Sequence, residues 1–248
     1  RAMGTEAVVV DPFSSQPMPL DTPQYRSLDA ALVEHADADG ALIASPTETH
    51  LEYMRACAGG GLPFYVEKPV CATQQLEECR WLVADLSPAQ ERCCAVGHQY
   101  RFSDAWDVLL PLWLGGNSGI SFRAQDDLVQ RYGRNVDEVM AAHPIDTAMW
   151  LLGPALAVHL TSDGVRFFGR IEHERGYSAY ALHMAQGPRF SSIAGWGQAV
   201  EFADIDLMYE RCLQAWLEWL GGGRVSGRLA SLSDGLAVVD VLSLVDSG

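Results

Sequence analysis

Residues 63–69 read Pro-Phe-Tyr-Val-Glu-Lys-Pro, and this stretch decides the fold. Its apolar part, residues 63–66, predicts a short buried strand, because aromatic and β-branched residues favour strands. Pro69 fixes the exit of that strand and restricts Lys68 to an extended conformation. Lys68 is therefore expected at the carboxyl end of a buried strand, the edge at which open α/β sheets bind their ligands.

The same pattern continues on both sides of this stretch. Apolar strand candidates lie at residues 6–11, 40–46 and 93–97. Helical spacings separate them, at residues 28–35, 49–58 and 73–86. Alternating strands and helices are typical of a doubly wound parallel sheet. We therefore expect an α/β fold that begins with a Rossmann-like dinucleotide-binding domain over residues 1–102.

The second half of the chain has longer strand candidates separated by turn signals. They lie at residues 119–125, 166–173, 177–184 and 189–194, and helical patterns at 135–152 and 206–220 flank them. This predicts an α+β domain with a mainly antiparallel sheet over residues 103–230, for substrate binding and oligomerisation. The last helical pattern, in residues 231–248, is expected to pack back on the first domain.

Composition excludes several classes of partner. The 248 residues carry 17 basic and 32 acidic side chains, a formal charge of −15 that repels nucleic acid and anionic lipid. We find no apolar run long enough to span a membrane and no signal peptide. The six cysteines lack the spacing of a zinc or redox site, so we expect free thiols, no metal and a cytoplasmic protein.

Several segments, in this order, resemble one family of enzymes. They are Ala-Ser-Pro-Thr-Glu-Thr-His at 44–50, Glu-Lys-Pro at 67–69, Gly-His-Gln-Tyr-Arg-Phe at 97–102, His-Pro-Ile-Asp at 143–146, Met-Trp-Leu-Leu-Gly at 149–153, Met-Tyr-Glu at 208–210 and Ser-Leu-Ser-Asp-Gly at 231–235. Together they resemble the glucose-fructose oxidoreductase, inositol dehydrogenase and MocA (Gfo/Idh/MocA) family. The resemblance implies hydride transfer between NAD and a carbinol or keto carbon of a sugar, cyclitol or nucleotide-linked sugar. It also implies a homodimer or homotetramer formed through the second-domain sheet.

Lys68 and His143 are the candidate catalytic residues. A desolvated lysine amine takes part in proton transfer near neutral pH, and the resemblance implies that Lys68 contacts both cofactor and substrate hydroxyl. Histidine titrates where carbinol oxidation needs a base. The alternatives are a surface lysine with a snorkelling stem and a core histidine bonded to a backbone carbonyl. Asp146, on the same helical face as His143, is expected to be structural or to orient a neighbour.

One position departs from the family pattern. The best-known relatives carry an aspartate four residues before the histidine, where this chain has Val139. Some branches that act on nucleotide sugars also lack that aspartate, so we expect a changed substrate rather than lost activity. The alternatives are a catalytically inactive sensor or scaffold, and another NAD-dependent chemistry on the same fold, such as a glycosidase or imine reductase.

Asp11 is the residue on which the choice of cofactor rests. It ends the first apolar run, where a Rossmann acid binds the adenosine ribose and repels a 2′-phosphate, so NAD is favoured over NADP. The alternative is an acid that caps the turn before Pro12. By resemblance, further cofactor-binding residues are Ser45, Pro46, Thr47, His50, Glu67, Lys68, Gln99 and Arg101.

A glycine-rich phosphate-binding turn is absent from the printed sequence. Residues 1–4, Arg-Ala-Met-Gly, look like the end of the helix that follows such a turn, so we expect the protein to begin earlier. The other interpretation is a variant that cannot hold a pyrophosphate at a helix N-terminus. Because the preceding strand would be central, its absence would expose two strand edges.

Overall fold

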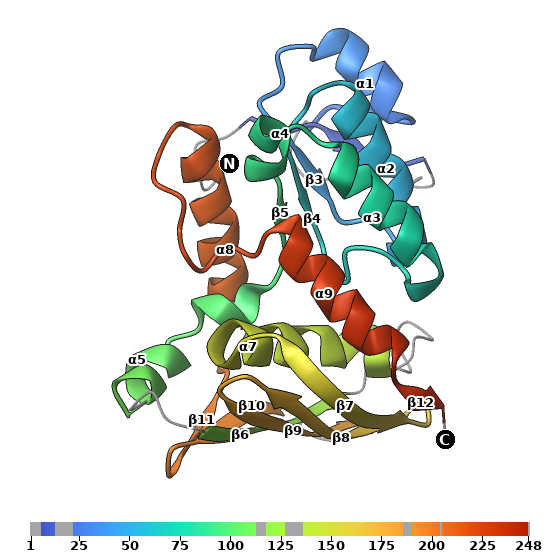
Figure 1. Ribbon diagram of the computed structural model, residues 1–248. Helices are drawn as coiled ribbons and strands as arrows, with labels where there is room; N and C mark the ends of the chain where they lie inside the picture. The colour runs from blue at the N-terminus through green and yellow to red at the C-terminus, as the bar shows by residue number, and fades with distance from the viewer. Residues whose placement is uncertain are drawn as a thin grey trace.

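The structure is a computed structural model, and it describes residues 6–12, 22–112, 118–126, 136–185, 190–203 and 205–247. Short parallel strands with helices packed around them form one half (Figure 1). A broad sheet covered on one face by helix α7 forms the other, and α9 runs from one half to the other (Figure 1). None of the described helices is long and apolar enough to span a bilayer.

The parallel strands form two separate sets among the described residues. Strands β1 (Val9–Val10) and β2 (Gln24–Tyr25) pair with each other, and β3 (Ala41–Ile43), β4 (Phe64–Val66) and β5 (Ala95–Val96) form a second sheet. All these pairings are parallel. β1 and β3 thus each have one described neighbour, β2 and β4. The other edge of each strand is not paired with a described strand.

Four helices accompany these strands. They are α1 (Leu28–Glu34), α2 (Thr47–Gly59), α3 (Leu76–Asp85), preceded by the 3₁₀ turn Thr73–Gln75, and α4 (Pro88–Arg92). Ser27 and Ser87 cap α1 and α4 by accepting a backbone N–H three residues on. Helix α2 buries Leu51, Met54 and Cys57 against the strands, the spacing that an amphipathic helix requires.

The second half contains a seven-stranded mixed sheet. Its strands are β6 (Ser118–Asp126), β7 (Ala155–Ser162), β8 (Arg166–His173), β9 (Gly176–Met184), β10 (Phe190–Gly195), β11 (Gln198–Glu201) and β12 (Asp246–Ser247), in the order β11-β10-β6-β9-β8-β7-β12. The β6–β9 and β7–β12 pairs are parallel and the rest antiparallel. The predicted fold class, a Rossmann-like half and a mainly antiparallel half, is confirmed.

Between the halves, the chain runs through a 3₁₀ turn (Gln99–Phe102), α5 (Ala105–Leu109) and a second 3₁₀ turn (Leu110–Leu112). A π-helical turn (Asp137–Ala141) leads into α7 (Ala142–Leu152). Ile145 and Leu152 of α7 are fully buried in the same cluster as Phe122 and Phe167 of the sheet. Helix α7 ends at Gly153, whose φ of 86° favours glycine.

Two later helices connect the halves. Helix α8 (Ile205–Leu220) packs on β4 and β5 through Trp216, rather than flanking the seven-stranded sheet as its position in the sequence suggested. The reason is its apolar face, which meets Tyr65, Ala95 and Phe102. Helix α9 (Leu232–Ser243) contacts both α3 and α7. All six cysteines are free thiols, and five of them are buried, as expected.

Candidate functional site

Lys68 stands at the carboxyl end of β4, directly before Pro69, to which it is joined by a cis peptide. It is the one lysine among the 17 basic residues of the printed chain, so the other 16 are arginines. Arginine stays protonated in proteins, whereas a lysine amine can lose its proton when its surroundings shift its pKa. The single titratable amine of this chain is therefore at the ligand-binding edge of the parallel sheet.

His143 lies in the first turn of α7 and is 5% exposed. Its ring is stacked on Tyr100, with centroids 4.7 Å apart and an interplanar angle of 17°. Burial, the positive charge of Lys68 and the neighbouring His98 hold the pKa of His143 well below its usual value. The charge of Lys68 thus reaches the ring of His143, so the structure brings the two predicted catalytic residues into one electrostatic environment.

His98 is a third titratable group in this environment, and the sequence did not assign it a role. Its ring meets that of His143 edge-on, with centroids 5.8 Å apart. Burial lowers its pKa to about 4, with further lowering by Arg101 and Lys68 and an opposing effect of Asp146. His98 could have been identified from the sequence as a histidine in the turn directly after β5. That strand pairs with β4, which precedes Lys68.

Several buried polar atoms near these rings have no hydrogen-bond partner among the described residues. They are both ring nitrogens of His98, Oε1 of Gln99, Nδ1 of His143 and Oγ1 of Thr147. Buried polar groups in proteins are nearly always hydrogen-bonded, so these atoms indicate a place for a polar ligand or water. A carboxamide and a hydroxyl are groups of the required kind. The residues present therefore fit the nicotinamide end of NAD together with an alcohol substrate.

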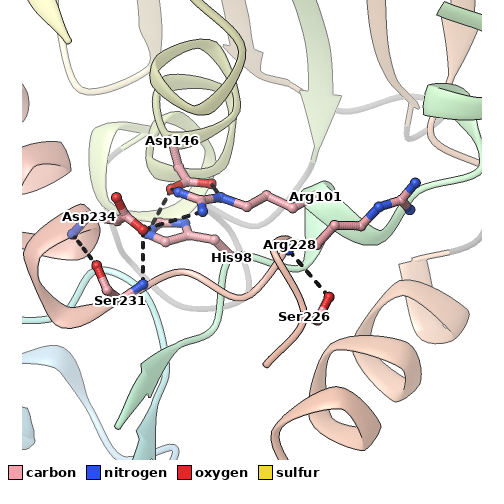
Figure 2. A network of polar contacts seen from close by, with 7 residues as sticks. All are labelled: His98, Arg101, Asp146, Ser226, Arg228, Ser231 and Asp234. Carbon is pink, nitrogen blue, oxygen red and sulfur yellow. Dashed lines mark hydrogen bonds and ion pairs between the residues drawn. The ribbon is translucent and has the colours of Figure 1, made fainter. Parts of the chain in front are cut away.

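Arg101 has a different environment from the one expected at a cofactor. Its Nε and Nη2 donate to Oδ2 and Oδ1 of Asp146 at 2.8 and 2.5 Å, and its Nη1 donates to Asp234 at 3.3 Å. Figure 2 shows the guanidinium between these carboxylates, with His98 beside them. Asp234 also caps α9 with Ser231. Arg101 thus ties α7 to α9 beneath the site, and Asp146 orients it, as expected for a structural acid.

The loops after β3 and β4 are joined by His50. Its Nδ1 lies 3.0 Å from the carbonyl oxygen of Pro69, and its Nε2 lies 2.9 Å from that of Ser45. Both ring nitrogens are therefore engaged by backbone. The structure brings Ser45, Pro46, Thr47 and His50 together at the start of α2, and it connects this group directly to the loop that follows Lys68.

A crevice of about 420 Å³ lies at this junction between the two halves. Thr47 and Pro69 line it from the parallel sheet, Asp137 from the turn before α7, and Ser243 from the end of α9. Lys68 and His143 are not among the described residues that line it. The loops with predicted cofactor residues therefore border open space, while the two histidines lie in the closed interior.

Two further predicted residues, Glu67 and Asp11, directly follow strands β4 and β1. The carboxyl of Glu67 is partly buried and accepts a hydrogen bond of 3.5 Å from Tyr209 on α8. Asp11 follows β1, and its backbone N–H donates to Tyr25 at 3.0 Å. The sheet of β1 and β2 that carries Asp11 is separate from the sheet of β3, β4 and β5 that carries Lys68. Val139 falls in the π-helical turn before α7.

Part of the chain matches a family of known proteins. Residues 7–98 match the family model described as "Oxidoreductase family, NAD-binding Rossmann fold" (GFO_IDH_MocA). The chain is 32% identical to the rhizopine catabolism protein MocA of Rhizobium meliloti over 98 residues, 39% of this chain and 30% of that protein. It is 28% identical to inositol 2-dehydrogenase 2 of Saccharopolyspora erythraea over 133 residues, 49% of this chain and 37% of that protein.

A solved structure extends the likeness in fold to the second half. It is the WlbA (WbpB) dehydrogenase of Thermus thermophilus in complex with NAD and UDP-GlcNAcA, with a TM-score of 0.77, 19% identity and coverage of 98% of this chain and 87% of that one. At this identity the likeness shows the fold alone. The match to the two curated relatives spans less than half of their length. Over residues 7–98, the chain is thus similar to the Gfo/Idh/MocA oxidoreductase family.

Proposed function

We propose that this protein is an NAD-dependent dehydrogenase that acts on a carbinol of a sugar, cyclitol or nucleotide-linked sugar. The observation that carries the proposal is the place of Lys68 at the ligand-binding edge of the parallel sheet, together with the buried polar atoms of His98, Gln99 and His143 that have no partner among the described residues. Bound NAD would accept the hydride from the carbinol carbon. The residues of the chain have to handle the proton that leaves the hydroxyl as the carbonyl forms.

Lys68 and His143 have complementary roles in that proton transfer. The ammonium of Lys68 donates a hydrogen bond to the substrate oxygen and stabilises the negative charge that develops there. His143 is neutral at neutral pH because its pKa is lowered, so its ring is able to accept a proton. The same nearby charge disfavours a lasting imidazolium, so the proton would pass on to solvent rather than stay on His143.

Cofactor recognition is assigned to the loops at the carboxyl ends of the parallel strands. Thr47 lines the crevice, directly after Ser45 and Pro46, and Gln99 offers a buried Oε1 without a described partner. Asp11 would bind the adenosine ribose and select NAD over NADP. Arg101 and His50 are assigned as positioning residues instead, because their donors are engaged by Asp146 and by backbone carbonyls.

The substrate class follows from the relatives. One curated relative is an inositol dehydrogenase, and the WlbA structure holds UDP-GlcNAcA. Val139 in place of the usual aspartate favours the nucleotide-sugar branch. The same position favours the second candidate, a non-catalytic sensor that binds NAD without turnover.

A second copy of the chain is the proposed partner at the outer face of the seven-stranded sheet. Phe168 on β8 and Tyr177 on β9 are large apolar side chains that are 49% and 44% exposed there. Exposed aromatic side chains that cluster on a sheet face mark an interaction surface. A homodimer or homotetramer would cover them.

The proposal is tested with full-length protein and a panel of myo-inositol, UDP-GlcNAc and UDP-GlcNAcA, with NADH formation as the readout. We expect turnover of at least one compound, and a loss of about 10²–10³-fold in Lys68→Arg, which keeps the charge but replaces the compact ammonium donor with a planar guanidinium. Arg55→Lys, an exposed exchange on α2, is the matched control. NAD binding without turnover on any compound supports the sensor, and no NAD binding contradicts both candidates.

A further inference from the structure

Helix α8 contacts the end of β4 through two hydroxyl groups. The hydroxyl of Tyr65 donates to Sγ of Cys212 at 3.3 Å, and that of Tyr209 donates to Oε2 of Glu67 at 3.5 Å. Tyr65 and Glu67 are two residues apart and share one side of the strand, whereas Tyr209 and Cys212 are three apart and share one helix face. This side of β4 thus contacts α8 directly beside Lys68.

The carboxyl of Glu67 has little freedom to move away from this contact. A Cβ placed on Gly97 would lie 3.1 Å from Oε1 of Glu67 and 2.9 Å from the hydroxyl of Tyr65. Such distances are shorter than ordinary contacts, so a glycine is needed at residue 97 for Glu67 to lie over the end of β5. The carboxyl is held between that glycine and the phenol of Tyr209.

Tyr209 affects the charge state of this carboxyl. Burial raises the pKa of Glu67, and the charge of Lys68 together with hydrogen bonds from the Lys68 backbone and from Tyr209 opposes that rise. Among the described residues, Tyr209 is the side chain that donates to Glu67. The phenol also accepts a hydrogen bond from the side chain of Gln99, which lowers the pKa of Tyr209 against the effect of burial. Tyr209 therefore joins Glu67, next to Lys68, to Gln99 in the turn after β5.

We propose that Tyr209 is a positioning residue of the active site, which holds Glu67 ionised and in place as the counter-charge of Lys68. Its effect on catalysis rests on the proposed function, because Lys68 is the group that would contact substrate. Without the phenol, the partly buried carboxyl keeps fewer donors and takes up a proton at higher pH. An uncharged Glu67 no longer stabilises the ammonium of Lys68. The second half of the chain, through α8, thereby influences the protonation of the catalytic amine.

The test is a pH titration of ¹³Cε-lysine-labelled full-length protein by NMR, without cofactor or substrate. The Lys68 signal, identified by its loss in Lys68→Arg, reports the ionisation of the amine and, as a smaller step, that of the adjacent carboxyl. Glu67→Gln should abolish the smaller step and lower the pKa of Lys68. In Tyr209→Phe the smaller step should move to higher pH. Tyr53→Phe, on α2, should leave it unchanged.

Two results would overturn the proposal. One is that the smaller step occurs at the same pH in Tyr209→Phe as in the wild type. The other is that the pKa of Lys68 does not change in Glu67→Gln. Circular dichroism of each variant shows whether it is folded, and Glu67→Gln supplies the answer if Tyr209→Phe is not. Because the titration needs no turnover, a failure here is distinct from a failure of the dehydrogenase assignment.

Discussion

Arg101 and Asp146 form a two-pronged ion pair in the interior, and their side chains are 4% and 1% exposed. The pair joins the turn after β5 to α7, the two segments that carry His98 and His143. Removing one partner of a buried pair leaves the other charge without compensation, which is costly. The pair therefore fixes the relative position of the two histidines.

Arg101→Met should lower the free energy of unfolding by about 3–5 kcal/mol, measured by urea denaturation, because it leaves the carboxylate of Asp146 buried and unpaired. The control is Arg170→Met, which breaks an exposed pair with Glu172 and should cost less than about 1 kcal/mol. Equal losses in the two variants would show that the buried pair has no special role.

Acid should destabilise the protein through its buried histidines. The pKa of His98 is about 4 in the fold and near 6.5 in an unfolded chain, so the unfolded state binds more protons between these values. Its contribution to stability is present above pH 6.5 and is lost as the pH falls toward 4, by about 2 kcal/mol at pH 5. His98→Phe should weaken this dependence in urea titrations at pH 7 and pH 5, whereas the exposed His159→Phe should not. An unchanged dependence in His98→Phe would contradict the lowered pKa.

Asp11→Ala should shift cofactor preference toward NADP. The carboxylate would no longer repel the 2′-phosphate, so the ratio of the NADP to the NAD dissociation constant should fall by about tenfold or more, equivalent to about 1.4 kcal/mol. Calorimetric titration with both cofactors measures it. Asp39→Ala, an exposed acid before β3, is the matched control. A ratio that stays constant in Asp11→Ala would assign the residue to the turn before Pro12.

Phe168→Glu should disrupt the proposed homo-oligomer and give a monomer, as seen by light scattering. A carboxylate on the outer face of the sheet would have to be buried without a partner when a second copy docks, which is unfavourable. Val225→Glu places the same charge in the exposed loop after α8 and should leave the assembly intact. An unchanged mass for Phe168→Glu would move the interface elsewhere.

Much of the fold could be predicted from the sequence, because the spacing of apolar residues distinguishes helices from strands. The strand expected at 166–173 is β8, and the helix expected at 206–220 is α8 within one residue. Strand β7 was missed because its burial does not alternate cleanly: Leu156 and His159 are exposed, and the residues between them are partly buried. The spacing of apolar residues also does not reveal which other helix or strand they pack against. The packing of α8 on β4 and β5 therefore had to come from the structure.

The site was predictable to a similar degree. Lys68 and His143 could be proposed as candidates, since a lysine at a strand end and a histidine on an apolar helix are visible in the sequence. The role of Arg101 in a buried ion pair was not, because its partners lie 45 and 133 residues away along the chain. His98 and Tyr209 were missed for the same reason: their importance comes from long-range contacts.

We propose that Lys68 and His143 share one site. Histidine-selective NMR of Lys68→Met is the direct test. Removing the positive charge should raise the pKa values of both His143 and His98, since that charge lowers them in the wild type. The signals of the exposed His159 and His183 serve as internal controls. A rise confined to the two buried histidines is the predicted result. Unchanged pKa values for both would place Lys68 outside their environment and contradict the proposed mechanism.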